Sequence, residues 1–226
     1  MVDKIAYNKI IKRIYDKNVT LVAVSKTKPA EDIRELYTMG QRDFGENYVQ
    51  ELTEKQQSLP TDIRWHFIGH LQGNKVKFIA PFVHLIHGID SFKLLKEVNK
   101  QAAKHNRIID CLLQIHIAQE ETKFGFDENE LRSVTEKITE EESILKNIKV
   151  AGLMGMASFT NDMNKVRNEF KYLRSLFDKY KSYQTNNFNM QILSMGMSSD
   201  YAIAVEEGSN IVRIGSLLFG ARVYNN

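Results

Sequence analysis

The sequence predicts an α/β fold: one domain, residues 1–226, built as a parallel (β/α)8 TIM barrel. Short apolar segments alternate with amphipathic segments eight times along 226 residues. Most of the apolar segments are continuous runs, which is typical of strands that are covered on both faces. Hydrophobic residues make up 42% of the chain, enough for one sizeable core. A doubly wound open sheet is the main alternative, and the pattern favours the barrel.

The expected strands are the apolar runs themselves. They are the segments 20–26, 42–48, 63–70, 83–90, 108–117, 148–157, 190–197 and 210–220. The intervals between them carry helical patterns. Segment 29–40 opens at Pro29, has Glu31 and Asp32 in its first turn and ends at Gly40, so it combines helix start and stop signals.

Further helices follow from the same reasoning. Segment 91–106 has Ser91 as a plausible N-cap and an apolar stripe behind it. Segment 161–180 repeats its apolar residues at three- and four-residue steps, which predicts a helix in the outer layer. Only six residues follow Gly220, so we expect the amphipathic segment before Thr20 to take the place of an eighth helix.

Composition argues against several classes of protein. Lysine and arginine number 31 against 28 acidic residues, and the charges are interspersed, so we expect neither a nucleic-acid nor a membrane partner. The single Cys111 excludes a disulfide framework and suits a reducing cytoplasm. The first residues lack the apolar core of a signal peptide, and no run is long enough to span a bilayer. We therefore expect a cytoplasmic protein.

Lys26 is the first candidate for chemistry. Reactive groups of a parallel barrel collect at the C-terminal ends of its strands, and Lys26 follows the apolar run "TLVAV" at such an end. Most lysines in such places extend their ammonium group to solvent. Desolvation here would instead favour the neutral, nucleophilic amine. On that interpretation Lys26 forms a Schiff base with a carbonyl compound.

The last two strands carry a complementary feature. "SMGMSSDY" turns on glycine and serine before a short helix, and "RIGSLLFG" places Gly215 and Ser216 on the neighbouring strand. Loops after strands seven and eight of such barrels often bind phosphate. Ser198 alone would be read as a helix N-cap. Together with Lys26, however, the pattern predicts a ligand with both an aldehyde and a phosphate, namely pyridoxal 5′-phosphate.

Arg213 and three histidines are further polar residues near the ends of the expected strands. Arg213 lies within an apolar strand and needs an acceptor, which is either a carboxylate or the pyridine nitrogen of the ligand. His66, His70 and His116 lack a carboxylate or thiol at ligand spacing. We interpret them as core or rim side chains and predict no metal site.

Seven motifs carry a resemblance to a known family. They are "LVAVSKTKP", "GQRDFGENYVQE", "WHFIGHLQGNK", "HGIDS", "GLMGMA", "LSMGMSSDYAIAVEEGS" and "VRIGSLLFGAR". In this order, from about Leu21 to Arg222, they resemble the YggS/PROSC family, the pyridoxal phosphate (vitamin B6) homeostasis proteins. The resemblance implies the fold-type III barrel of the alanine racemase N-terminal domain, with an N-terminal helix and no C-terminal β domain. The segment before "LVAVSK" is short for the family.

The resemblance also implies a set of site residues. Lys26 would form the internal aldimine, and Arg213 would face the pyridine nitrogen. The expected cofactor-binding residues are Lys26, Asn47, Met154, Gly196, Met197, Ser198, Arg213, Gly215 and Ser216, with the last serines and glycines at the phosphate and with Asn47 and Met154 near the ring. No residue is assigned a catalytic role.

Three functions compete. The first is a carrier that binds the cofactor, buffers it and supplies it to apoenzymes, with little turnover. The second is a racemase-like enzyme, but fold-type III racemases take a catalytic tyrosine from an additional β domain that this sequence has no segment to build. The third is an aldolase-like barrel that uses Lys26 without a cofactor, and the motif match argues against it. We expect the carrier, a monomer whose partners are pyridoxal phosphate, amino acids and, transiently, apoenzymes.

Overall fold

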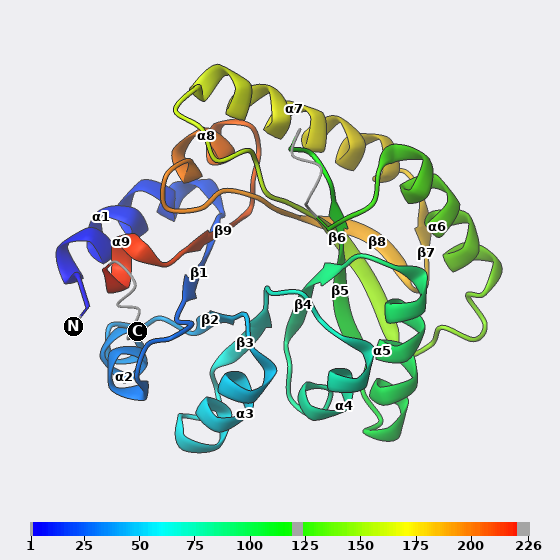
Figure 1. Ribbon diagram of the computed structural model, residues 1–226, viewed down its shortest axis with the longest axis horizontal. Helices are drawn as coiled ribbons and strands as arrows, with labels where there is room; N and C mark the ends of the chain where they lie inside the picture. The colour runs from blue at the N-terminus through cyan, green and yellow to red at the C-terminus, as the bar shows by residue number, and fades with distance from the viewer. Residues whose placement is uncertain (1, 119–123, 221–226) are drawn as a thin grey trace.

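The computed structural model describes residues 2–118 and 124–220. Within these residues, eight parallel strands close into a barrel that is surrounded by helices (Figure 1). The barrel strands are β1 (Thr20–Val24), β2 (Asp43–Glu46), β3 (Arg64–Phe67), β4 (Leu85–Ile89), β5 (Ile109–Ile115), β6 (Ile148–Gly155), β8 (Phe188–Ser194) and β9 (Ile211–Ile214). Seven lie within the predicted segments, and β8 begins two residues before the predicted segment 190–197.

Strand pairing distinguishes the barrel from an open sheet. Each strand from β1 to β5 pairs with the next, β6 pairs with β8, β8 pairs with β9, and β9 pairs with β1, so these eight strands close on themselves. The ladder between β8 and β9 consists of one register pair, Ser194 with Ile211. The Asn210 side chain supports this junction by accepting a hydrogen bond from Leu193 N at 2.8 Å. The predicted barrel is confirmed, and the open sheet is excluded.

One strand was not predicted. β7 (Gln184–Thr185) forms a hairpin with the start of β8, pairing antiparallel across the turn at Asn186 and Asn187. Two residues are too few to produce a periodic pattern, and none of the predicted segments includes them. The hairpin lies outside the barrel ladder and does not alter its order.

The helices surround the barrel. They are α1 (Lys4–Ile14), α2 (Ala30–Thr38), α3 (Val49–Ser58), α4 (Val76–Ile79), α5 (Phe92–Lys104), α6 (Glu128–Glu140), α7 (Met163–Tyr180), α8 (Tyr201–Glu206) and α9 (Ser216–Phe219), with 3-10 turns at Tyr15–Lys17 and Gly73–Lys75. The predicted cap of α5 is present, because the Ser91 side chain accepts a hydrogen bond from Leu94 N at 3.3 Å. In the described residues every helix is too short or too polar to cross a bilayer.

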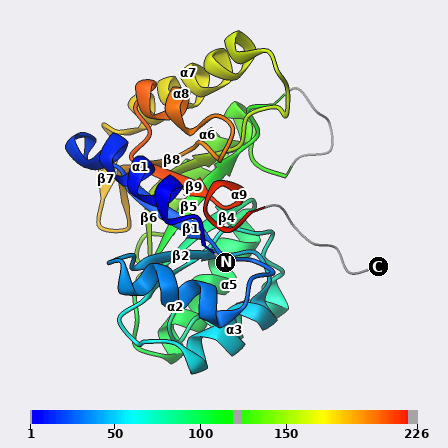
Figure 2. The ribbon, with the colours of Figure 1, turned by 90° about the vertical axis from the view of Figure 1, so that its left-hand side faces the viewer.

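Helix α1 takes the position of an eighth barrel helix. On one side, Lys4 forms an ion pair with Glu35 of α2 at 2.8 Å. On the other side, the Arg13 guanidinium lies 5.6 Å from the centre of the Tyr201 ring of α8. Figure 2 shows α1 in front of β1 and β9, beside the single turn of α9. The opening helix therefore covers the junction between the first and last strands, as the sequence predicted.

The apolar core has two parts. The larger part lies between the strands and the helices and includes Phe44, Phe67 and Phe170, each almost fully buried. The smaller part is made by side chains of the barrel strands and includes Val22 and Met154. Buried polar side chains lie on the same strands, namely His66, His87, Ser194 and Arg213. These polar groups need partners, and their partners lead to the candidate site.

Candidate functional site

A cavity of about 530 Å³ opens at the C-terminal ends of the barrel strands. It draws its lining from the segments that follow β1, β2, β3, β6, β8 and β9, so residues far apart in the sequence meet there. Seven of the nine predicted site residues line it: Lys26, Asn47, Met197, Ser198, Arg213, Gly215 and Ser216. Such a volume suits a small phosphorylated ligand.

Lys26 and Lys28 enter the cavity from the turn after β1. Ser25 N continues the ladder with a hydrogen bond to the Gly45 carbonyl at 3.0 Å, and Lys28 N closes the turn on the Ser25 carbonyl at 3.0 Å. Thr27 has a φ of 63° and donates its N–H to Glu51 at 2.6 Å. Lys28 Nζ donates to the backbone carbonyl of Phe219 at 2.8 Å. The turn therefore brings both lysines of the motif to the cavity, and Lys28 also joins it to the segment after β9.

A buried charge network lies beneath this turn. Glu46 is fully buried, and its Oε1 accepts hydrogen bonds from Ser25 Oγ at 2.6 Å and from Lys55 Nζ at 2.8 Å. Lys55 also donates to the Ser25 carbonyl and to Glu51. Burial raises the pKa of Glu46 to about 7, against the opposing effect of the Lys55 ammonium. The network fixes the backbone at Ser25, directly before Lys26.

The opposite wall comes from the segments after β8 and β9. Gly196 has a φ of 95°, and a Cβ there would lie 2.5 Å from the Ala204 Cβ, so the turn requires glycine. Ser198 Oγ accepts a hydrogen bond from Gly215 N at 3.3 Å, which joins the two segments. Asp200, not Ser198, occupies the N-cap position of α8. The hydroxyl of Ser198 is therefore part of the cavity wall.

Arg213 lies at the base of the cavity and is 5% exposed. Its Nη1 donates to Ser194 Oγ at 2.6 Å and its Nη2 donates to the Gly155 carbonyl at 3.0 Å. Among the described residues no carboxylate lies within ion-pair distance, so the carboxylate alternative is wrong. Burial lowers the pKa of Arg213 to about 10, opposed by the Asp200 carboxylate nearby. The guanidinium is therefore charged at neutral pH and engaged with neutral acceptors.

Two predicted residues do not line the cavity. Met154 is buried among side chains of the barrel strands, such as Val22 and Leu112, whereas Met156, two residues later, lines the cavity. Strand alternation would put residues 154 and 156 on the same side, but Met156 lies just beyond the end of β6, where that alternation no longer sets the side chain's direction, so the motif alone could not separate the two methionines. Gly196 acts through its backbone, because its carbonyl accepts a hydrogen bond from Arg213 N at 2.9 Å.

Two of the histidines are hydrogen-bonded as expected. His66 is buried and contacts both Asp43, at 3.0 Å, and His87, at 2.9 Å. His70 lies at the rim, where it contacts Asp90 at 3.1 Å and stacks on Phe124 with ring centres 4.4 Å apart. Across residues 2–118 and 124–220, no three histidine, cysteine or carboxylate side chains gather in a way that could hold a metal ion.

The chain is similar to known proteins over most of its length. The family model described as alanine racemase, N-terminal domain, matches residues 2–223. A pyridoxal phosphate homeostasis protein from Aquifex aeolicus is 43% identical over 90% of this chain and 87% of its own length. The human protein of the same name is 42% identical over 91% of this chain and 77% of its own. The chain belongs to the pyridoxal phosphate homeostasis protein family.

Solved structures place this family member beside two kinds of neighbour. The PipY protein of Synechococcus elongatus, solved with pyridoxal phosphate bound, has a TM-score of 0.80 and 34% identity, and the match covers 93% of this chain and 100% of that one. Alanine racemase from Clostridium difficile has a TM-score of 0.72 at 15% identity, covering 99% of this chain and 59% of the enzyme. The second likeness shows the fold alone. The motif match continues to Arg222, which lies outside the described residues.

Sequence reasoning missed parts of this site. Lys55 was not singled out, because it is one lysine on an amphipathic helix, thirty residues from the carbonyl it binds. His87 was also missed, although it interrupts the apolar run of β4. A histidine inside an otherwise apolar strand is the signal that could have found it, since a buried imidazole requires hydrogen-bond partners. Both residues support the cavity from behind rather than line it.

Proposed function

We propose that this chain binds pyridoxal 5′-phosphate in the 530 Å³ cavity and serves intracellular homeostasis of that cofactor. It holds the cofactor covalently through Lys26 and supplies it to other proteins. The observation that carries the proposal is the convergence of an amine, two hydroxyls and a buried, charged guanidinium on one cavity. The names of the Aquifex and human relatives, and the ligand of PipY, support the same conclusion.

The phosphate group would bind where the segments after β8 and β9 meet. Ser198, Gly215 and Ser216 line this side of the cavity, and the hydrogen bond between Gly215 N and Ser198 Oγ holds the two segments together. Hydroxyl groups bind phosphate oxygens by charge-assisted hydrogen bonds. The Gly196 turn sets the position of Ser198, because it admits no side chain.

Arg213 would bind the ring nitrogen of the cofactor. Its two terminal nitrogens are already anchored to Ser194 and Gly155, so the guanidinium is held in one orientation. Guanidinium is a donor that keeps its proton at ordinary pH. It therefore meets an unprotonated pyridine nitrogen with a hydrogen bond and leaves the ring unprotonated.

Two atoms suit the other side of the ring. Lys26 Nζ would attach to the aldehyde carbon, with loss of one water molecule. Asn47 Oδ1 is buried and has no hydrogen-bond partner among the described residues. Asn47 lines the cavity, where a donor of the bound ligand would satisfy this oxygen. An unpaired buried acceptor costs free energy, so its pairing favours the loaded protein.

The cavity wall favours a carrier over an enzyme. When bound, the cofactor would supply an electron sink for chemistry at the α-carbon of an amino acid. In the described lining, however, the titratable side chains are Lys26, Lys28 and Arg213, and neither of the last two is a ready general base. Lys28 donates to the Phe219 carbonyl, and Arg213 remains charged. Loss of one positioned base typically lowers a rate by about 10²–10⁴-fold.

The proposal extends to the form and partners of the protein. We place it in the cytoplasm as a monomer that accepts amino acids at the cofactor without turning them over at enzymatic rates. It hands cofactor to apoenzymes in transient encounters.

One experiment separates the two functions. Purified protein is loaded with pyridoxal phosphate, then mixed with an apoenzyme while recovery of that enzyme's activity is followed. In parallel, α-proton exchange is measured across the common amino acids. We expect cofactor transfer with exchange close to background. Turnover of any amino acid at about 1–10³ s⁻¹ would overturn the carrier and establish the racemase-like enzyme.

A further inference from the structure

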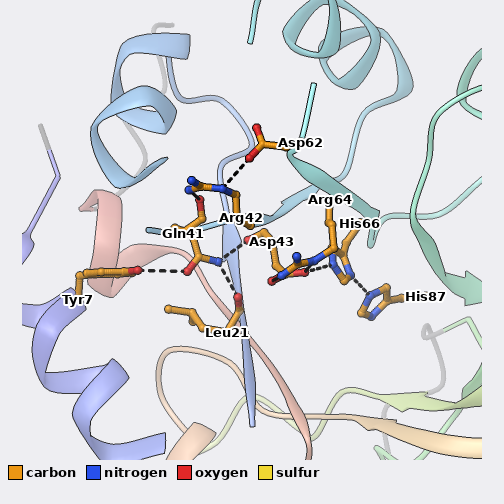
Figure 3. Close-up of polar contacts among 9 residues, drawn as sticks. All are labelled: Tyr7, Leu21, Gln41, Arg42, Asp43, Asp62, Arg64, His66 and His87. Carbon is orange, nitrogen blue, oxygen red and sulfur yellow. Dashed lines mark hydrogen bonds and ion pairs between the residues drawn. The ribbon is translucent and has the colours of Figure 1, made fainter. Parts of the chain in front are cut away.

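A continuous row of hydrogen bonds crosses the barrel interior and ends at Arg213. From the far end, Asp43 Oδ1 contacts His66 Nε2 at 3.0 Å, and His66 Nδ1 contacts His87 Nε2 at 2.9 Å. His87 Nδ1 contacts Ser194 Oγ at 3.0 Å, and Ser194 Oγ accepts from Arg213 Nη1 at 2.6 Å. Figure 3 shows the first part, with Asp43 between Arg64 and His66 and with His87 beyond. We call these five residues the interior relay.

The Asp43 end of the relay is an ionised carboxylate. Arg64 Nε donates to Asp43 Oδ1 at 2.7 Å, and the two side chains form an ion pair. Burial alone would raise the pKa of Asp43, but hydrogen bonds from His66 and Arg64 lower it to about 2. Both Asp43 and His66 line a second cavity, of about 260 Å³, at the N-terminal end of the barrel. The relay therefore connects the two ends of the barrel.

When both imidazoles are neutral, an ionised Asp43 fixes the direction of every bond in the relay. A carboxylate only accepts, so His66 carries its hydrogen on Nε2 and accepts at Nδ1 when neutral. His87 must then donate from Nε2 and accept at Nδ1. Burial lowers the pKa of His87 well below its usual value, which agrees with a neutral ring. Ser194 is left to donate its hydroxyl hydrogen to His87, so its lone pairs face Arg213.

We propose that Asp43, His66, His87 and Ser194 are positioning residues that hold Arg213 as an oriented donor for the ring nitrogen of the cofactor. None of the first three lines the cofactor cavity, and each acts through its neighbour in the relay. The inference rests on the proposed role of Arg213. With both imidazoles neutral, only one set of tautomers gives each bond of the relay a single hydrogen. In that set the ionised Asp43 determines, through the two imidazoles, that the Ser194 hydroxyl hydrogen points to His87 and that the Ser194 lone pairs face Arg213.

The first test needs no cofactor. Long-range ¹⁵N–¹H spectra of the ligand-free protein report which ring nitrogen of each histidine carries hydrogen. We expect His66 and His87 both to be neutral and protonated at Nε2. A ring protonated at Nδ1, in either residue, would overturn the relay whether or not the protein binds pyridoxal phosphate. This arm separates failure of the relay from failure of the proposed function.

The second test asks whether the relay acts on the ring nitrogen. Affinity is measured for pyridoxal phosphate and for its 1-deaza analogue, which has carbon in place of that nitrogen. We expect Ser194→Ala to reduce the preference for the natural cofactor about tenfold, because Arg213 loses its oriented acceptor. Ser194→Thr retains the hydroxyl and should restore the preference. An unchanged preference in Ser194→Ala would refute the proposal.

A matched control distinguishes a loss of the relay from a general destabilisation of the protein. Ser209 is another buried serine next to β8 and β9, and its Oγ donates to backbone carbonyls at Met195 and Ile211 instead of joining the relay. Ser209→Ala should lower stability without changing the preference between the two ligands. If Ser209→Ala lowers that preference as much as Ser194→Ala does, the effect is a general loosening of the barrel and the proposal fails.

Discussion

Lys28 Nζ donates a hydrogen bond to the backbone carbonyl of Phe219 at 2.8 Å, which ties the turn after the first barrel strand to the short helix after the last one. The lysine two residues earlier, Lys26, lines the same cavity from the start of that turn. Two amines within one motif therefore have different tasks. Lys28 joins two segments of the cavity wall through its hydrogen bond to Phe219, and Lys26 is our candidate for attachment of the cofactor.

The first prediction follows from this difference. Borohydride reduction of loaded protein, followed by peptide mass mapping, should place the cofactor on Lys26. Lys26→Ala should lose the chromophore of the covalent link but retain some affinity, since Ser198, Ser216 and Arg213 remain. The control is Lys28→Ala, which should still be labelled at Lys26. A label that maps mainly to Lys28 in the unsubstituted protein would contradict the assignment of Lys26 as the attachment site.

The second prediction concerns the two serines of the wall. Ser198→Ala and Ser216→Ala should each weaken binding of pyridoxal phosphate by roughly ten- to a hundredfold, because each removes a hydrogen bond to a charged group worth about 1.5–3 kcal/mol. Unphosphorylated pyridoxal should lose much less. Ser175→Ala, on the exposed side of α7, serves as the control. Equal losses of affinity for pyridoxal phosphate and pyridoxal would show that the phosphate group binds elsewhere in the protein.

The third prediction is a pH dependence of stability. The pKa of Glu46 is raised to about 7 by burial, from an ordinary value of 4.5. The folded state then holds a proton that the unfolded state releases, so the contribution of Glu46 to stability falls as pH rises from about 4.5 to about 7. Glu46→Gln should remove this component, which urea unfolding across that range would measure. A parallel pH dependence in the two proteins would contradict the raised pKa.

The fourth prediction compares two glycines with left-handed backbones. Gly196 and Gly40 have φ of 95° and 98°, but a Cβ at Gly196 would lie 2.5 Å from the Ala204 Cβ whereas one at Gly40 meets nothing within 4 Å. Both alanine substitutions should cost about 1–3 kcal/mol of backbone strain. Gly196→Ala should cost more and should also weaken cofactor binding. Thermal unfolding with and without pyridoxal phosphate measures both effects, and similar losses at the two positions would refute the steric argument.

Much of this architecture could be predicted because it rests on local patterns. Continuous apolar runs located all eight barrel strands, and the polar residues that end them located most of the cavity. Lys26 and Ser198 could be paired before the structure because the barrel brings all strand ends to one face. The motif match then assigned roles that spacing alone could not.

What could not be predicted depends on contacts between distant segments. His66 looked like an isolated histidine, and its partners come from β2 and β4, so only the closed barrel brings the relay together. Lys55 reaches Glu46 from the buried face of α3, and nothing in the sequence marks this lysine as buried. Met156, which lines the cavity, lies just beyond the end of β6, where no periodicity fixes the direction of a side chain.

The sparse ladder between β8 and β9 has a consequence for how occupancy is reported. These strands share one register pair, whereas β5 and β6 share seven, and the cavity wall at Ser198 and Gly215 spans the gap just above. A ligand bound there would bridge the two segments that follow this short ladder. Amide hydrogen exchange in β8 and β9 should slow when the ligand is bound, far more than exchange in β5 and β6. The loaded and empty proteins would then differ in how readily β8 and β9 separate, and a partner protein that binds at the strand ends could distinguish the two forms.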